Sequence, residues 1–247
     1  MEIKAETKSL SDEYGYSTLD TISAADNFNR WMYAAIAPHC SGRILEIGGG
    51  IGNISAQFLK EGKDLTVTEL QDEYCTIIRN KLARYKGLKD VVRMDITDPG
   101  FESMHMDLLG KFDTVFALNV VEHIADRQLA LVNCRKLLKP GGKLVILVPA
   151  FQMLYNRFDK SLGHYLRFTR KSLNQLMAEG GFTVVNSWYF NFIGIFGWWF
   201  SGTVLRKEMI PEGQMALYNR LVPVFRIIDV FTQKIAGLSV ISVGLKE

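Results

Sequence analysis

The chain has 247 residues, of which 48% are hydrophobic, 22% are charged and only 6 are prolines. This composition is globular and excludes a disordered, collagen-like or low-complexity chain, and the length suits one large domain or two small ones. A net charge of +3 is too small for a dedicated nucleic-acid binder. Residues 1–150 carry 18 basic and 20 acidic side chains, but residues 151–247 carry 11 and 6, so we expect the two parts to have different roles.

The three cysteines, Cys40, Cys75 and Cys134, lie far apart and are odd in number, which argues against a disulfide framework or a zinc site. This usage favours a reducing compartment, and we expect a cytoplasmic protein. The N-terminal segment has no apolar core of the kind that a signal peptide needs. The most apolar window, from Phe190 to Phe200, is shorter than the roughly 20 residues that cross a bilayer.

The first predicted element is a helix over Asp20–Ala37, and from Arg43 onward short apolar runs alternate with helical stretches, as in an α/β protein. The predicted strands of this part are 43–47, 64–69, 91–94, 112–118 and 143–149, and the predicted helices are 53–61, 72–85 and 125–138. The third helix closes with a Lys-Pro-Gly-Gly stop signal at residues 139–142. The last of these strands is continuously apolar, which is typical of a strand buried on both faces of a parallel sheet.

The pattern changes after Pro149. We predict a helix over 170–179, a strand over 182–189 and a final strand over 238–245. Between the last two strands, apolar residues recur at helical spacing from Leu217 to Phe231, and Pro223 should kink or split that helix.

The most specific motif is ILEIGGGIGN at residues 44–53, where a strand runs into glycines and then into a helix start. Backbone can approach a ligand closely there. The position that would complete the dinucleotide pattern G-x-G-x-x-G is Asn53, and the carboxylate of Glu46 would repel a pyrophosphate. We therefore expect a ligand with a cationic amino-acid part and no phosphates.

Three further polar positions end successive strands, at the usual ligand edge of a parallel sheet. Glu69 is placed to accept both hydroxyls of a ribose, or else pairs with a surface lysine. Asp95 can accept a bond from an exocyclic amine, or else serves as a turn residue. Asn119 opens the segment NVVEHI after the fourth strand.

From Arg43 to Pro149 the chain resembles the class I S-adenosylmethionine-dependent methyltransferases, through E-x-G-G-G-x-G, the acids ending the second and third strands, NVVEHI and LKPGGKL. The resemblance implies a Rossmann-like α/β fold with a seven-stranded, mostly parallel sheet, helices on both faces and an antiparallel last strand. It implies S-adenosyl-L-methionine as the cofactor. The implied cofactor residues are Glu46, Gly48, Gly49, Gly50, Gly52, Glu69, Leu70, Asp95, Ile96 and Asn119.

Segments beyond the core, GHY at 163–165 and RFTRKSL at 167–173, resemble a bacterial subgroup of type 11/12 methyltransferases. We expect His164 to be the catalytic base for a hydroxyl acceptor and His123 to be a second candidate, although a structural role suits His123 better. A related E-x-x-E-H segment binds a divalent metal in ubiquinone-type O-methyltransferases. Asn119 replaces its first acid here, so we expect no metal.

The acceptor is expected to contact five side chains and to carry an acidic or phosphate group. The cations among them could instead form a solvated first helical turn. These five are Tyr165, Arg167, Arg170, Trp198 and Trp199.

We divide the chain into an N-terminal helical cap (1–40), a methyltransferase core (41–190 and 238–247) and a helical, aromatic insertion (191–237) that acts as a substrate lid. The insertion combines aromatics with cations, so it is either a folded cap with an apolar core or a surface with at most peripheral membrane contact. The oligomeric state is left open.

We expect transfer of a methyl group to a small-molecule, glycan or lipid-linked acceptor, without nucleic acid as a partner. The alternatives are a nicotinamide-dependent oxidoreductase or epimerase and a non-catalytic nucleotide-binding adaptor. The first predicts the dinucleotide glycine spacing and a Tyr-x-x-x-Lys pair, and Tyr155 is followed four positions later by Asp159. The second would tolerate loss of Glu46 and Glu69, yet both are present.

Overall fold

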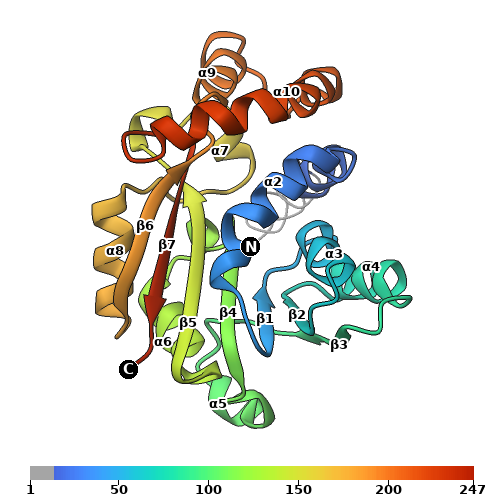
Figure 1. The fold of residues 1–247 in the computed structure, drawn as a ribbon, viewed down its shortest axis with the longest axis vertical. Helices are drawn as coiled ribbons and strands as arrows, with labels where there is room; N and C mark the ends of the chain where they lie inside the picture. Colours follow the sequence, from blue (N-terminus) through green and yellow to red (C-terminus); the bar gives the residue numbers. More distant parts are fainter. Residues whose placement is uncertain (1–13) are drawn as a thin grey trace, which may run out of the picture.

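A seven-stranded sheet forms the centre of the protein, whose computed structural model describes residues 14–247. The strands are β1 (Ile44–Ile47), β2 (Leu65–Glu69), β3 (Leu88–Arg93), β4 (Phe112–Leu118), β5 (Leu138–Pro149), β6 (Thr183–Phe190) and β7 (Ser239–Leu245). Their order is β3-β2-β1-β4-β5-β7-β6, and β7 runs antiparallel to both of its neighbours while the other pairs are parallel (Figure 1). The predicted Rossmann-like sheet with an antiparallel last strand is confirmed.

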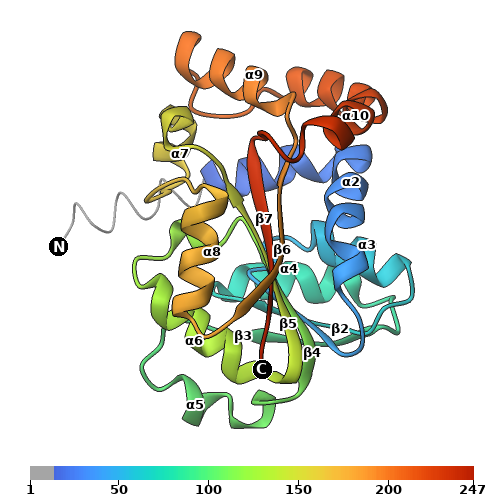
Figure 2. The ribbon, with the colours of Figure 1, turned by 60° about the vertical axis from the view of Figure 1, so that its left-hand side comes forward.

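Helices cover both faces of the sheet, because alternate residues of the buried strands point to opposite sides. On β5, Leu144 and Ile146 pack in a core with α6 (Arg127–Leu137) and α8 (Arg170–Glu179). The intervening Val145 packs in the other core with α2 (Asp26–Ile36), α3 (Asn53–Lys60) and α4 (Asp72–Leu82). Figure 2 shows α6 and α8 on one side of the strands and α2 and α3 on the other.

The remaining helical elements lie mainly in the connections. The short α5 (Phe101–Met104) precedes β4, and α7 (Arg157–Ser161) follows β5. Between β6 and β7 the chain forms α9 (Gly194–Trp199), a π-helical turn (Phe200–Val204) and α10 (Glu212–Thr232). Figure 1 shows α7, α9 and α10 at the end of the molecule to which β5 points, which is the carboxyl edge of the parallel strands.

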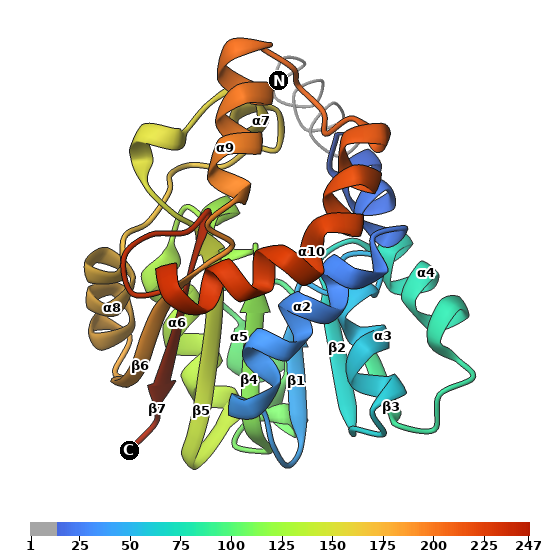
Figure 3. The same ribbon diagram turned by 45° about the horizontal axis from the view of Figure 1, so that its top comes forward.

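Two predicted elements differ from the structure in their extent, and the helix with Pro223 agrees in part. The single helix over 20–37 is wrong: helical residues 14–23 are separated from α2 by a break at residues 24–25, where the Ala25 side chain is buried. The helix stop predicted at 139–142 is confirmed, since α6 ends at Leu137. The strand predicted from 143 begins earlier, at Leu138: Lys246 donates to the Gly142 carbonyl and accepts from Gly141 within this stretch. Of the two effects expected of Pro223, a kink or a split, the structure excludes the split, because α10 continues through Pro223, and Figure 3 shows the helix bent.

The N-terminal helices and the insertion are in contact. The side-chain oxygen of Asn219, in α10, accepts from the Phe28 backbone N–H at 3.0 Å. The backbone carbonyl of Asn219 accepts from the side-chain amide of Asn27 at 3.1 Å. Tyr218 packs edge-on against Phe28. In Figure 3, α2 and α10 accordingly lie side by side over the sheet.

Candidate functional site

The glycine loop after β1 is shaped by positions that admit only glycine. Gly48 has φ +69°, and a Cβ there would lie 2.5 Å from Cγ2 of Val120, which follows β4. Gly50 has φ +56° and faces Leu19 of the N-terminal helical segment. The loop ends at Gly52, the N-cap of α3. The sequence therefore builds a narrow backbone cradle between β1 and β4, covered by the residues around Leu19.

Glu69, at the end of β2, is bonded to this cradle. Its Oε2 accepts from the Gly50 N–H at 2.8 Å and its Oε1 accepts from the Leu70 N–H at 2.7 Å. Burial raises the pKa of Glu69, and the backbone N–H groups oppose that shift. The expected alternative, a pair with a surface lysine, finds no support among the described contacts. A carboxylate has about four acceptor sites, so Glu69 retains acceptors for a ligand.

Glu46 lies beneath the loop. Its carboxyl accepts a hydrogen bond from the Ser55 hydroxyl of α3, and burial raises its pKa to about 7. Near neutral pH this group is therefore only partly charged, because the surrounding protein disfavours the carboxylate. Direct contact between Glu46 and a cationic ligand stays a prediction.

The other predicted cofactor residues lie along the same edge of the sheet. Asp95 follows β3, and its Oδ1 accepts from the Thr97 backbone N–H and hydroxyl, so it serves at least as a turn residue. The Ile96 side chain is buried in the core, whereas Leu70 is about half exposed (48%). Asn119 follows β4 with φ +54° and is exposed. Cofactor contacts of all four stay predictions.

A buried histidine–aspartate–arginine group lies in the segment after β5. Nδ1 of His164 is 2.7 Å from Oδ1 of Asp159, and the same oxygen accepts from Nε of Arg167 at 2.8 Å. Burial favours the neutral acid, but the bonds from His164 and Arg167 outweigh it and lower the pKa of Asp159. An ionised carboxylate only accepts hydrogen bonds, so Nδ1 of His164 carries a proton, and in a neutral ring Nε2 is then the nitrogen that accepts.

Asp159 is the site residue that sequence reasoning missed. It lies at the third position of α7, where it closes a capping box with Asn156. The spacing of Asn156 and Asp159 was the available signal, and it predicts only a helix start. The bonds to His164 and Arg167 depend on the turn between α7 and Arg167.

The segment after β4 meets this group. The Tyr165 N–H donates to the Glu122 carbonyl at 2.8 Å, and the rings of His123 and His164 pack edge to face with centroids 4.6 Å apart. Both carboxyl oxygens of Glu122 are buried without a hydrogen-bond partner in the described part of the chain. Burial raises the pKa of Glu122 to about 8, so it is mainly a neutral acid at pH 7.

Glu122, His123 and His164 each offer one ligand atom, and these atoms lie within 4.8 Å of one another. The expectation of no metal rested on Asn119 and did not foresee that His164 joins the cluster. A protonated Glu122 is a poor ligand, because a metal must first displace its proton. The expectation of no metal stays a prediction.

The five expected acceptor residues are placed differently from one another. Arg167 is buried, with its guanidinium bonded to Asp159 and the Ala150 carbonyl and its charge centre 4.8 Å from the Trp198 ring. It is therefore not part of a solvated helical turn. Trp198 also packs on Phe158, and its indole N–H is buried with no partner among residues 14–247. Acceptor contacts of Arg167 and Trp198 stay predictions.

The other three expected acceptor residues lie further out. Tyr165 and Trp199 are exposed, and the Arg170 guanidinium lies over the Tyr189 ring. Arg167 thus shares Asp159 with His164, and Trp198 contacts this group through Arg167, whereas Trp199 is exposed. Acceptor contacts of these three stay predictions too.

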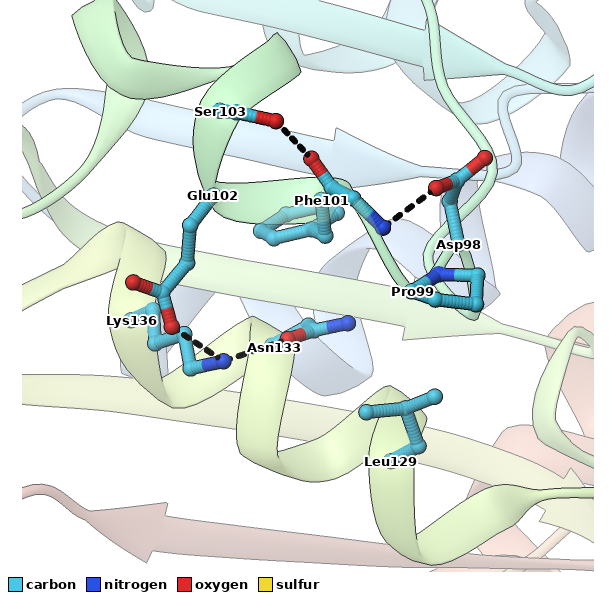
Figure 4. A pocket seen from close by; sticks show the side chains of 9 residues that line it. Asp98, Pro99, Phe101, Glu102, Ser103, Leu129, Asn133 and Lys136 are labelled. Carbon is cyan, nitrogen blue, oxygen red and sulfur yellow. Dashed lines mark hydrogen bonds and ion pairs between the residues drawn. The ribbon is translucent and has the colours of Figure 1, made fainter.

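A separate hollow of about 220 Å³ lies between the loop after β3, α5 and α6. Figure 4 shows its mostly polar lining, in which Lys136 pairs with Glu102 at 2.7 Å. Its lining residues include none of the predicted site residues.

Comparison with known proteins agrees with this geometry. Residues 45–144 match the family model for a methyltransferase domain. A ubiquinone biosynthesis O-methyltransferase from Xanthomonas oryzae pv. oryzae is 33% identical over 104 residues, which is 42% of this chain and 41% of that protein. The match thus spans about two fifths of the length of this curated relative.

Solved methyltransferase structures share the fold over most of the chain. A methyltransferase from Thermotoga maritima superposes with a TM-score of 0.61 and 16% identity, covering 93% of this chain and 95% of that one. Phosphoethanolamine N-methyltransferase 2 from Haemonchus contortus, solved with S-adenosylhomocysteine, gives 0.59 and 15% identity, covering 87% of this chain and 52% of that one. At these identities the likeness concerns the fold.

Proposed function

We propose that this chain, which carries a class I methyltransferase domain, transfers a methyl group from S-adenosyl-L-methionine to a small-molecule, glycan or lipid-linked acceptor. The observation that carries the proposal is the junction of Glu69 with the glycine loop, which lies on the same sheet edge as the His164–Asp159 pair. The first arrangement suits a nucleoside without a pyrophosphate, and the second suits removal of a proton from a hydroxyl.

The residues present fit S-adenosyl-L-methionine. A Cβ at Gly48 would collide with Val120, so the loop keeps its narrow form, and Glu69 offers carboxylate acceptors beside it for the ribose. The exposed Leu70 offers an apolar surface for the adenine at the end of β2. The cofactor, when bound, supplies a methyl group on a positively charged sulfur that a nucleophile displaces in line.

The chain's own residues align the acceptor and take up its proton. Because Asp159 holds Nδ1 of His164, Nε2 can accept the proton of an acceptor hydroxyl. Arg167 neutralises Asp159, which would otherwise be a buried unpaired charge. This geometry favours O-methylation, since an amine that arrives neutral needs no protein base.

The insertion of residues 191–237 acts as the lid over the acceptor. Trp198 of α9 lies on Arg167 and Phe158, so the insertion contacts the same group that holds His164. An apolar lid suits an acceptor with a hydrophobic or lipid-linked part. Fewer cations are available to bind an acidic acceptor than we expected, because the guanidinium of Arg167 is hydrogen-bonded to Asp159.

A methylation assay with labelled S-adenosyl-L-methionine tests the function, with phenolic, glycan and lipid-linked hydroxyl acceptors and mass spectrometry of the products. We expect a product that is 14 mass units heavier, roughly one methylene, and no turnover when NAD replaces the donor. Failure of all acceptors together with absent donor binding by calorimetry would overturn the proposal.

The same assay tests the metal. Turnover should survive EDTA, because the carboxyl of Glu122 is mainly protonated at neutral pH. A loss of turnover that magnesium or zinc restores would instead identify the Glu122–His123–His164 cluster as a metal centre.

A further inference from the structure

The insertion exposes far more apolar surface than the rest of the chain. Of the 20 large apolar side chains exposed in residues 14–247, 13 lie between residues 196 and 235. We call these 13 the insertion face. They are Phe196, Trp199, Phe200, Val204, Leu205, Met209, Leu217, Leu221, Val224, Ile227, Val230, Phe231 and Ile235. Monomeric soluble proteins rarely leave such a concentration uncovered without a binding role.

Helix α10 is apolar on two sides, which a helix at the edge of a folded cap does not require. One side, with Met215, Val222 and Tyr218, packs inward toward α2 and the core. The residues at 217, 221, 224 and 231 recur at helical spacing on another side and are exposed, Phe231 by 76%. The inward side already secures the helix to the protein, so the exposed side is free for a partner.

The α9 end of the insertion face continues into α10. The Ser201 hydroxyl, in the π-helical turn, donates to the Gln214 side chain of α10 at 2.7 Å. Phe196, Trp199 and Phe200 are each about half exposed beside this junction. The face therefore extends over both helices at the carboxyl edge of the sheet, the end that carries the candidate site (Figure 1).

Exposed cations accompany the insertion face. Arg206, Lys207, Arg220, Arg226 and Lys234 are all exposed, and none makes an ion pair with the described part of the chain. The segment has three acids. Asp229 is buried and accepts from the backbone N–H groups of Asn191 and Phe192, and Glu208 lies 3.8 Å from Arg157. Glu212 is thus the one other acid among residues 191–237.

We propose that the insertion face binds the surface of a lipid bilayer that contains acidic headgroups. Aromatic and aliphatic side chains enter the interface while the neighbouring cations meet the lipid phosphates. A second copy of the chain is a poorer occupant, because a two-fold contact would bring five cations against five with few acids to pair them. No helix of residues 14–247 is long and apolar enough to cross a membrane.

Vesicle sedimentation tests the proposal without donor or acceptor, so its outcome is independent of the proposed enzymatic function. The chain should pellet with phosphatidylcholine vesicles that contain phosphatidylglycerol, much less with phosphatidylcholine alone, and less at high salt. The triple change Leu217→Gln, Ile227→Gln and Phe231→Gln should weaken binding by at least about tenfold, since it removes three inserted side chains.

Matched controls alter equally exposed apolar residues outside the insertion face. Met104→Gln, Met106→Gln and Val185→Gln should leave vesicle binding unchanged. Reversal of charge at Arg220 and Arg226 to Glu should also weaken binding, whereas the same change at the exposed Lys86 and Lys111 should have much less effect. Circular dichroism melts confirm that each variant is folded.

Three outcomes would overturn the proposal. One is no binding of the folded chain to phosphatidylglycerol vesicles, and another is equal losses in the insertion-face variant and its control. The third is a wild-type dimer in light scattering that the triple variant converts to a monomer, which would assign the face to a second copy of the chain.

Discussion

The chemistry at the scale of single residues depends on how buried charges are compensated. Asp159 stays ionised in a buried position because His164 and Arg167 both donate to it, whereas Glu122 has no such donors and keeps its proton. Two acids in one cluster thus have opposite states at neutral pH, and the difference follows from their hydrogen-bond partners. The ionised acid fixes the tautomer of His164 that can act as a base.

Replacement of His164 by Asn should lower kcat by about 10²–10⁴-fold with a hydroxyl acceptor, the usual contribution of a general base. The affinity for S-adenosyl-L-methionine should change little, because the glycine loop and Glu69 are untouched. His39→Asn is the matched control, since His39 packs on Trp188 before β1 begins. Normal turnover in His164→Asn would show that the base is elsewhere or not needed.

The raised pKa of Glu122 should make the stability of the protein depend on pH. Burial raises its pKa from 4.5 to about 8, so between these values the folded chain holds a proton that the unfolded chain has released. This favourable contribution is complete at low pH and is lost as the pH rises toward 8. The Tm should therefore fall over this range, and Glu122→Gln, which is neutral at every pH, should make the fall smaller. An equal fall in the variant would contradict a raised pKa.

At the scale of elements, strands were predictable and tertiary contacts were not. The strands β1, β2, β4 and β5 follow directly from buried apolar runs, and the glycines after β1 locate the loop. The bond from Tyr165 to the Glu122 carbonyl joins two segments separated by β5. No local pattern predicts the contact between these two segments. Asp159 was therefore missed, and Arg167 was predicted as an acceptor contact without its bond to Asp159.

The two neighbouring tryptophans of α9 should contribute unequally to the use of the acceptor. Changing both Trp198 and Trp199 to Ala should cripple acceptor use and leave donor affinity near normal, and kinetics against calorimetry measures the two effects. Trp198→Ala should account for most of the loss, because Trp198 packs on Arg167 and Phe158. Trp199 is half exposed, so Trp199→Ala should cost less. Normal methylation by the double variant would show that these tryptophans of the insertion do not take part in acceptor binding.

At the scale of the whole molecule, one edge of the sheet collects residues that are far apart in sequence. The parallel strands β1 to β5 all end there, which brings together Glu69, the loop after β4 and the segment after β5. The sequence predicted this edge because parallel order follows from alternating strands and helices. It did not predict how the insertion packs, since contacts such as Asn219 with Phe28 depend on segments about 190 residues apart.

The glycine loop and Glu69 should bind S-adenosyl-L-methionine, and calorimetric titration tests this binding most directly. The wild-type chain should bind the donor but not NAD, because Asn53 stands where a dinucleotide loop needs glycine and is held by Leu19 and Lys81. Glu69→Ala removes charge-assisted bonds worth about 1.5–3 kcal/mol each, so binding should weaken at least about tenfold. The exposed Glu61→Ala should bind normally. Absent binding to the wild type, or unchanged affinity in folded Glu69→Ala, would contradict the account.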